Sequence, residues 1–170
     1  EIYVVFGKSS GWGSSLALSS LDGSNGFRLD GESAYDFSGT SVSSAGDVNG
    51  DGYGDVIIGA IQAGSAGSSY VVYGKSGVWG SSLDLSSLDG SNGFRLDGVD
   101  ASDQSGYSVS SAGDVNGDGY GDVIIGAYRA TPSGKDSAGE SYVVFGGQNG
   151  WNASPTYILS LSGIDSGQFE

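Results

Sequence analysis

The stretch DVNGDGYGD occurs twice in this chain, at residues 47–55 and 114–122, and each copy runs directly into the apolar segment VIIGA. Oxygen-bearing residues stand at every second position of the stretch, and the glycines between them permit a tight backbone turn. This spacing is typical of a loop that binds calcium, because the ion takes about six to eight oxygen ligands from a flexible segment. The β-branched residues after each loop predict a strand rather than a helix.

Each loop offers four side-chain ligands and one backbone carbonyl. The predicted ligands are Asp47, Asn49, Asp51, Asp55 and the carbonyl of Tyr53 in the first loop, and Asp114, Asn116, Asp118, Asp122 and the carbonyl of Tyr120 in the second. An EF-hand loop would carry a bidentate glutamate at its twelfth position, where this chain has Ile58 and Ile125. A metal-free hairpin turn is the alternative interpretation. Because three carboxylates so close in sequence would repel each other without a cation, the sequence predicts two Ca²⁺ sites.

The composition excludes several classes of function. The 170 residues include 20 acidic and 6 basic side chains, which leaves a formal net charge of −14. The few cations are scattered, so nucleic acid and anionic membranes are poor partners. The chain contains no histidine and no cysteine, which removes Ser–His and Cys–His nucleophilic chemistry and the usual zinc sites. We therefore expect no catalytic residues and no enzyme activity.

The absence of cysteine does not indicate a cytosolic protein, because calcium can stabilise a small extracellular domain in place of disulfides. Open, loop-built calcium sites usually work outside the cell, where affinities on the order of 10⁻⁴–10⁻³ M suffice. The chain shows no signal peptide and no transmembrane run, and it begins with Glu1. The expectation is a mature or excised piece of a longer secreted or cell-surface protein.

The chain is an internal repeat with a period of about 67 residues. Residues 41–60 recur unchanged at 108–127, and residues 14–31 recur at 81–98 with one difference. Each unit offers four short strand candidates: SVSSAG before the loop, DVIIGA after it, then SYVVYG or SYVVFG, and finally GFRLDG. The segment DVIIGA is apolar on both faces, which predicts that it lies between two layers.

Four strands per repeated unit, without helical periodicity, predict an all-β fold of β-propeller-type blades with calcium-binding hairpin loops. A β-helix or a sandwich is the alternative architecture. Residues 1–31 would supply the third and fourth strands of a partial blade, residues 37–98 one complete blade, and residues 106–170 a blade with an incomplete fourth strand. About two and a half repeats cannot close a ring, which takes about four to eight blades. We therefore expect either self-association or a longer repeat array.

These residues resemble the FG-GAP repeats of integrin α-subunit propellers and their bacterial relatives. The family pattern, roughly FGxSVAxAGDVNGDGxxDLLVGAP followed by GAxYVFxG, is matched at every ligand position, whereas Ser38-Gly39 and Ser105-Gly106 stand where Phe-Gly is expected. The resemblance implies that the ions are structural and that each lies in the hairpin between the first two strands of a blade. The segment SLDGSNGFRLDG between units is more similar to bacterial surface or secreted proteins than to animal integrins.

Two other groups of residues have weaker functional interpretations. Either of two acidic sets could in principle supply a glycosidase pair, Asp30, Glu32 and Asp36, or Asp97, Asp100 and Asp103. They lie in a segment that differs between units, which favours a solvated loop. One tryptophan per unit (Trp12, Trp79 and Trp151) could stack on sugars, but the regular placement favours packing between blades.

The expected function is that of a calcium-stabilised extracellular structural or adhesion module, with a protein or glycan ligand at the loop face. The alternatives are a carbohydrate-binding, lectin-like propeller and the accessory domain of a secreted hydrolase.

Overall fold

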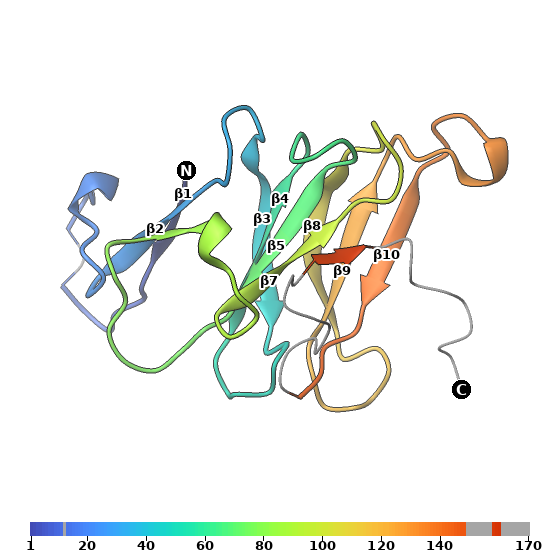
Figure 1. Cartoon of the computed structure of the whole chain (residues 1–170). Helices are drawn as coiled ribbons and strands as arrows, with labels where there is room; N and C mark the ends of the chain where they lie inside the picture. Colours follow the sequence, from blue (N-terminus) through green and yellow to red (C-terminus); the bar gives the residue numbers. More distant parts are fainter. Residues whose placement is uncertain (12, 149–157, 161–170) are drawn as a thin grey trace.

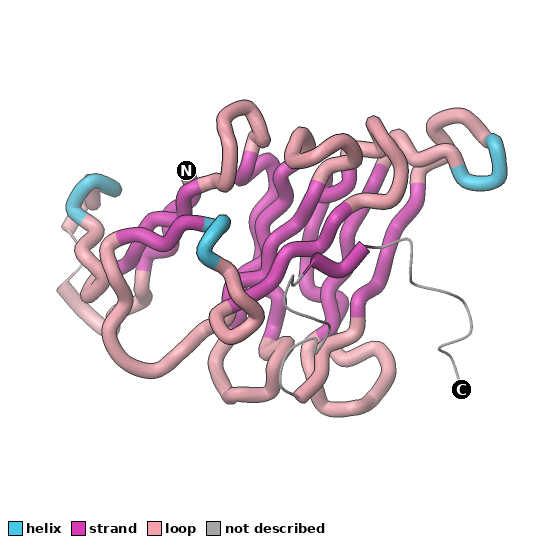
Figure 2. The backbone as a smooth tube through the Cα atoms, in the orientation of Figure 1, coloured by secondary structure: helices cyan, strands magenta, loops and turns pink. Residues whose placement is uncertain are grey.

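The structure is a computed structural model that describes residues 1–11, 13–148 and the backbone of 158–160, and it consists of β-strands joined by loops (Figures 1 and 2). The described residues contain no α-helix, only the short 3-10 helices Leu18–Ser20, Leu85–Ser87 and Pro132–Gly134. The prediction of an all-β fold is confirmed. Within the described residues, no helix has the length and apolar character needed to span a bilayer.

The complete unit folds into an antiparallel sheet of the four predicted strands. In spatial order these are β3 (Ser38–Gly46), β4 (Asp55–Ala60), β5 (Ser68–Val72) and β7 (Gly93–Asp97). The last unit repeats the first three as β8 (Ser105–Gly113), β9 (Asp122–Ala127) and β10 (Glu140–Val144). The first unit supplies β1 (Ile2–Val5) and β2 (Gly26–Asp30), the equivalents of β5 and β7. The fourth strand expected at the end of the last unit lies outside the described residues.

Two further strands, which the sequence analysis did not predict, link successive units. Strand β6 (Ser82–Asp84) belongs to the second unit but pairs in parallel with β2 of the first, with Leu83 opposite Leu29. Strand β11 (Ile158–Ser160) pairs in parallel with β7 in the same register, with Leu159 opposite Leu96. The second and third units therefore each add a short strand to the outer edge of the preceding unit's sheet. The unit boundaries predicted from the sequence do not coincide with the edges of the sheets.

The central strands β4 and β5 of the complete sheet are buried on both faces, as the apolar sequence of β4 predicts. On one face, Ile57 and Val71 belong to a core shared with the last unit, including Val123 and Ile125. On the other face, Ile58, Tyr70 and Val72 belong to a core shared with the first unit, including Ile2, Phe27 and Leu29. Full burial stabilises the fold by about 1.5–3 kcal/mol per large apolar side chain, so packing between units is a major source of stability.

Glycine allows the backbones of neighbouring sheets to meet directly. A Cβ atom added at Gly59 in β4 would lie 1.9 Å from the carbonyl oxygen of Gly106 in β8. A Cβ at Gly106 would in turn lie 2.6 Å from the carbonyl oxygen of Ser68. Next to this contact, the backbone N–H of Ser105 donates to the carbonyl of Ala66 at 2.8 Å, which ties the second sheet to the third.

We predict that Gly59→Ala lowers the free energy of unfolding by about 1–3 kcal/mol, because the added methyl group collides with backbone rather than with a movable side chain. Urea denaturation measures the change. The control is Gly7→Ala, since a Cβ there meets nothing within 4 Å and we expect a change within about 0.5 kcal/mol. Equal urea midpoints for Gly59→Ala and Gly7→Ala would contradict the close packing of β4 against β8.

Candidate metal centre

The two acidic loops lie where the resemblance placed them, in the hairpins that join the first two strands of a sheet. Residues 47–54 connect β3 to β4, and residues 114–121 connect β8 to β9. Both loops project from the same end of neighbouring sheets (Figure 1). Gly50 and Gly52 have φ angles of 73° and 87°, in the left-handed region that favours glycine, which explains their place between the acidic residues.

In the first loop, the predicted ligands fold around the loop's own amide groups. Asp47 accepts hydrogen bonds from the backbone N–H of Asp51 at 3.1 Å and of Gly52 at 2.9 Å. Asp51 accepts from the N–H of Tyr53 at 2.8 Å, and Asn49 accepts from the N–H of Asp51 at 3.1 Å. The second loop repeats these bonds at Asp114, Asn116 and Asp118 with nearly identical lengths.

The last acidic residue of each loop has a second role that the sequence analysis missed. Asp55, only 2% exposed, accepts from the N–H of Val48 at 2.7 Å and from that of Gly74, after β5, at 2.8 Å. Asp122 makes the same two bonds in the last unit, to Val115 and Gly146. In the sequence, the glycine that ends both YVVYG and YVVFG is the feature from which this contact could have been predicted. This carboxylate therefore ties its loop to the third strand.

Electrostatics disfavours ionisation of the first loop's buried carboxylate. Burial raises the pKa of Asp55 to about 6, the two amide hydrogen bonds oppose this shift, and the neighbouring charges of Asp51 and Asp47 add to it. The loop thus concentrates its carboxylates at the end of the sheet. A bound divalent cation would offset both the burial and the repulsion.

The donor set of each loop fits calcium, since it combines three carboxylates, an amide oxygen and a backbone carbonyl within one hairpin. A carboxylate oxygen that accepts one amide hydrogen bond retains another lone pair for a cation. Across the described residues, no group of three or more Asp, Glu, His or Cys side chains is already arranged to hold a metal ion. The loop's own amides engage these oxygens instead, and the ten ligand assignments stay predictions.

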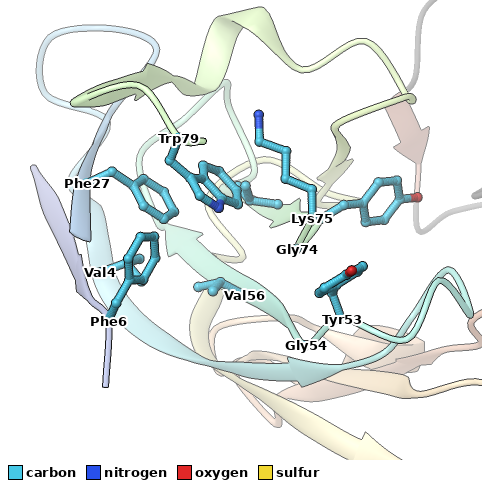
Figure 3. Close-up of a pocket in the computed structure, with 11 residues that line it drawn as sticks. Val4, Phe6, Phe27, Tyr53, Gly54, Val56, Gly74, Lys75 and Trp79 are labelled. Atoms are coloured by element: carbon cyan, nitrogen blue, oxygen red, sulfur yellow. The ribbon is translucent and has the colours of Figure 1, made fainter. Parts of the chain in front are cut away.

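Trp79 packs between units, as its placement in the sequence predicted. Its ring stacks on Phe27 of the first sheet with centroids 4.1 Å apart and an interplanar angle of 7°. The ammonium group of Lys75 lies 4.7 Å from the ring centroid, on the side away from Phe27 (Figure 3). With Phe27 on one face and Lys75 on the other, the position of the ring favours packing between units over stacking on a sugar. Trp12 and Trp151 lie outside the described residues.

The acidic residues considered as a glycosidase pair have structural partners. Arg95 donates to both carboxylate oxygens of Glu32, at 3.0 and 2.9 Å, and the hydroxyl of Tyr70 donates to the same group at 2.8 Å. Asp103 is 6% exposed and accepts from the N–H of Asp100 at 3.2 Å. Glu32 is nevertheless exposed, which agrees with the expectation of a solvated loop, whereas the buried side chain of Asp103 departs from that expectation.

A family model described as FG-GAP repeat matches residues 38–72 and 105–144. Each match begins with the first strand of a sheet, β3 or β8, and ends with its third, β5 or β10. The matched segments therefore contain both acidic loops and the strands that carry them.

Curated relatives of the chain are integrin α-subunits. Integrin alpha-6 of Gallus gallus is 33% identical over 118 residues, which is 66% of this chain and 10% of that protein. Integrin alpha pat-2 of Caenorhabditis briggsae is 44% identical over 62 residues, covering 36% of this chain and 5% of that protein. Integrin alpha-PS2 of Drosophila melanogaster is 29% identical over 146 residues, 84% of this chain and 10% of that protein. The chain thus spans a tenth or less of the length of these relatives, and a bacterial source stays a prediction.

We predict that Asp55→Ala destabilises the protein even in the presence of a chelator, by about 1–3 kcal/mol, because two amide donors lose a buried acceptor. Asp51→Ala, which removes an exposed carboxylate, should cost less than half as much under the same conditions. Urea denaturation in chelator measures both changes. Equal losses of unfolding free energy in the two variants would contradict the conclusion that Asp55 ties its loop to the third strand.

Proposed function

Because the chain carries FG-GAP repeats and is homologous to integrin α-subunits, we propose that it is a calcium-stabilised, non-catalytic adhesion module that works outside the cell. The observation that carries the proposal is the repetition of one acidic hairpin, with the same hydrogen bonds, at the same end of two neighbouring sheets. The resemblance of both loops to those of FG-GAP repeats implies that they bind divalent cations.

Calcium would act as a structural ion in this proposal. It would be held in the first hairpin by Asp47, Asn49, Asp51, Asp55 and the carbonyl of Tyr53, and in the second by Asp114, Asn116, Asp118, Asp122 and the carbonyl of Tyr120. The ion supplies positive charge that offsets the repulsion among the carboxylates. An ion that binds only the folded state contributes about 2.7 kcal/mol per site when its concentration is 100 times Kd.

We predict that the double variant Asp51→Ala, Asp118→Ala melts in millimolar calcium close to the temperature that the wild type shows in chelator. The reason is that each loop loses a central ligand and with it the stabilisation by mass action. Differential scanning calorimetry measures the melting temperatures of the wild type and the double variant, each in calcium and in chelator. Asp136→Ala, which removes an exposed carboxylate outside both loops, should retain the full calcium-dependent shift. A double variant that retained it as well would rule out these loops as the calcium sites.

The faces of the module support a role in an array of repeats. A cavity of about 270 Å³ lies beside the first loop and is lined by Phe6, Phe27, Tyr53, Gly54 and Gly74, among others (Figure 3). Between the second and third units, the equivalent position is filled by the first acidic loop. There the backbone N–H groups of Gly121 and Gly147 donate to the carbonyls of Asp47 and Val48. Val48 is 1% exposed, whereas its equivalent Val115 is 55% exposed.

The N-terminal segment that corresponds to β6 supports the same proposal. Leu83 and Leu85 pack against the core of the first unit, and Leu85 is 2% exposed. Their equivalents Leu16 and Leu18 are 41% and 45% exposed. We propose that residues 15–17 pair with the outer strand of another repeat of this type, as β6 pairs with β2. The adhesive ligand would bind at the end of the sheets that carries the loops, and the covered ring of Trp79 favours a protein over a glycan.

We predict that copies of the chain associate reversibly in millimolar calcium and that the variant Leu16→Asp, Leu18→Asp stays monomeric, because charged side chains cannot cover an apolar strand edge. Light scattering after size exclusion, over a range of concentrations, measures the mass. The control is Val78→Asp, because Val78 lies outside residues 15–18 and is 87% exposed. This variant should associate like the wild type. A monomeric wild type at every concentration would contradict self-association and leave only a covalently linked repeat as the partner.

A further inference from the structure

The two acidic loops are in direct contact with each other. The ring of Tyr120 in the second loop lies so close to Gly50 in the first that a Cβ added there would be 2.4 Å from the ring's Cε1 atom. The backbone N–H of Gly121, the residue after Tyr120, donates to the carbonyl oxygen of Asp47 at 2.8 Å. A Cβ added at Gly121 would lie 3.0 Å from the backbone nitrogen of Asp47. Both contacts join backbone or ring atoms, which have little freedom to adjust independently.

These contacts connect predicted ligands of one site to predicted ligands of the other. Gly50 stands between Asn49 and Asp51 of the first loop, and Asp47 is that loop's first ligand. On the opposite side, Gly121 stands between Tyr120 and Asp122 of the second loop. A change in the conformation of either loop therefore reaches ligand-bearing backbone of the other without passing through an intervening element.

We propose that the two calcium sites are coupled, and that an ion in the second loop raises the affinity of the first by holding Tyr120 and Gly121 against Gly50 and Asp47. This inference rests on the calcium binding proposed above, and it adds that each ion regulates the affinity of the other site. The physical reason is that the second ion orders the surface on which the first loop folds, so the first ion has less backbone to immobilise. Because coupling between binding equilibria is reciprocal, an ion in the first loop raises the affinity of the second by the same factor.

The equivalent tyrosine of the first loop makes no corresponding contact. Both side chains sit against a glycine that follows the third strand, Tyr53 against Gly74 and Tyr120 against Gly146. Tyr53, however, lines the open cavity beside the first sheet instead of contacting another acidic loop (Figure 3). Tyr120 is thus a positioning residue for the neighbouring site, whereas Tyr53 has no such neighbour among the described residues.

The test is a calcium titration of the full chain followed by ¹H–¹⁵N NMR, with the amides of Gly52 and Gly119 reporting on the first and second loop. In Asp118→Ala, which disables the second site, we expect the calcium midpoint at Gly52 to rise by about fivefold or more, the lower end of typical couplings. Asp51→Ala should raise the midpoint at Gly119 by the same factor. Tyr120→Ala should reproduce the rise at Gly52 although it retains its backbone carbonyl. Tyr35→Ala, which removes an 85% exposed tyrosine outside both loops, should leave both midpoints unchanged.

The possible outcomes separate this inference from the function on which it rests. Unchanged midpoints at Gly52 in both Asp118→Ala and Tyr120→Ala would overturn the coupling while leaving calcium binding in place. A wild type whose Gly52 and Gly119 amides do not respond to calcium would instead overturn the proposed calcium sites. Amides of β2 and β7, which lie outside both loops, report whether each variant is folded, and Asp118→Ala tests the coupling while it retains the side chain of Tyr120.

Discussion

The close approach of neighbouring sheets at glycine is the constraint on which the rest of the structure depends. Where Gly59 faces the carbonyl of Gly106, the backbones of β4 and β8 meet with no room for a side chain. That separation allows Ile57 and Val71 to share one core with Val123 and Ile125. It also brings the acidic loops at the ends of these sheets into contact. Packing between sheets and the geometry of the candidate ion sites are therefore consequences of the same spacing.

The short parallel strands give this packing a second, different kind of connection. Strands β6 and β11 leave their own units and pair with β2 and β7 of the preceding ones, each with a leucine opposite a leucine. Antiparallel pairing alone would leave the outer edge of every sheet open, and such edges invite uncontrolled association. A unit that closes the edge of its neighbour needs a neighbour itself. This dependence is the structural basis for proposing that the module works within an array.

Calcium, in the proposed function, would connect local electrostatics to this architecture. The loops concentrate carboxylates at one end of the sheets, and Asp55 and Asp122 anchor those loops to the third strands through buried hydrogen bonds. An ion bound there would stiffen the hairpin and the end of the sheet together. An adhesive surface built on that end would then keep its shape because rigid strands support it rather than flexible loops.

The sequence by itself determined the repeated unit, the main antiparallel strands and the position of each acidic loop between two of them, because these features follow from alternating or continuous apolar patterns and from turn residues that act locally. Only the tertiary structure decided which surfaces meet. The three-residue strands β6 and β11 carry too little pattern to be recognised, and their pairing depends on an edge far away in the chain. Likewise, Tyr120 lies against Gly50 only because neighbouring sheets bring them together, and no local pattern encodes such a long-range contact.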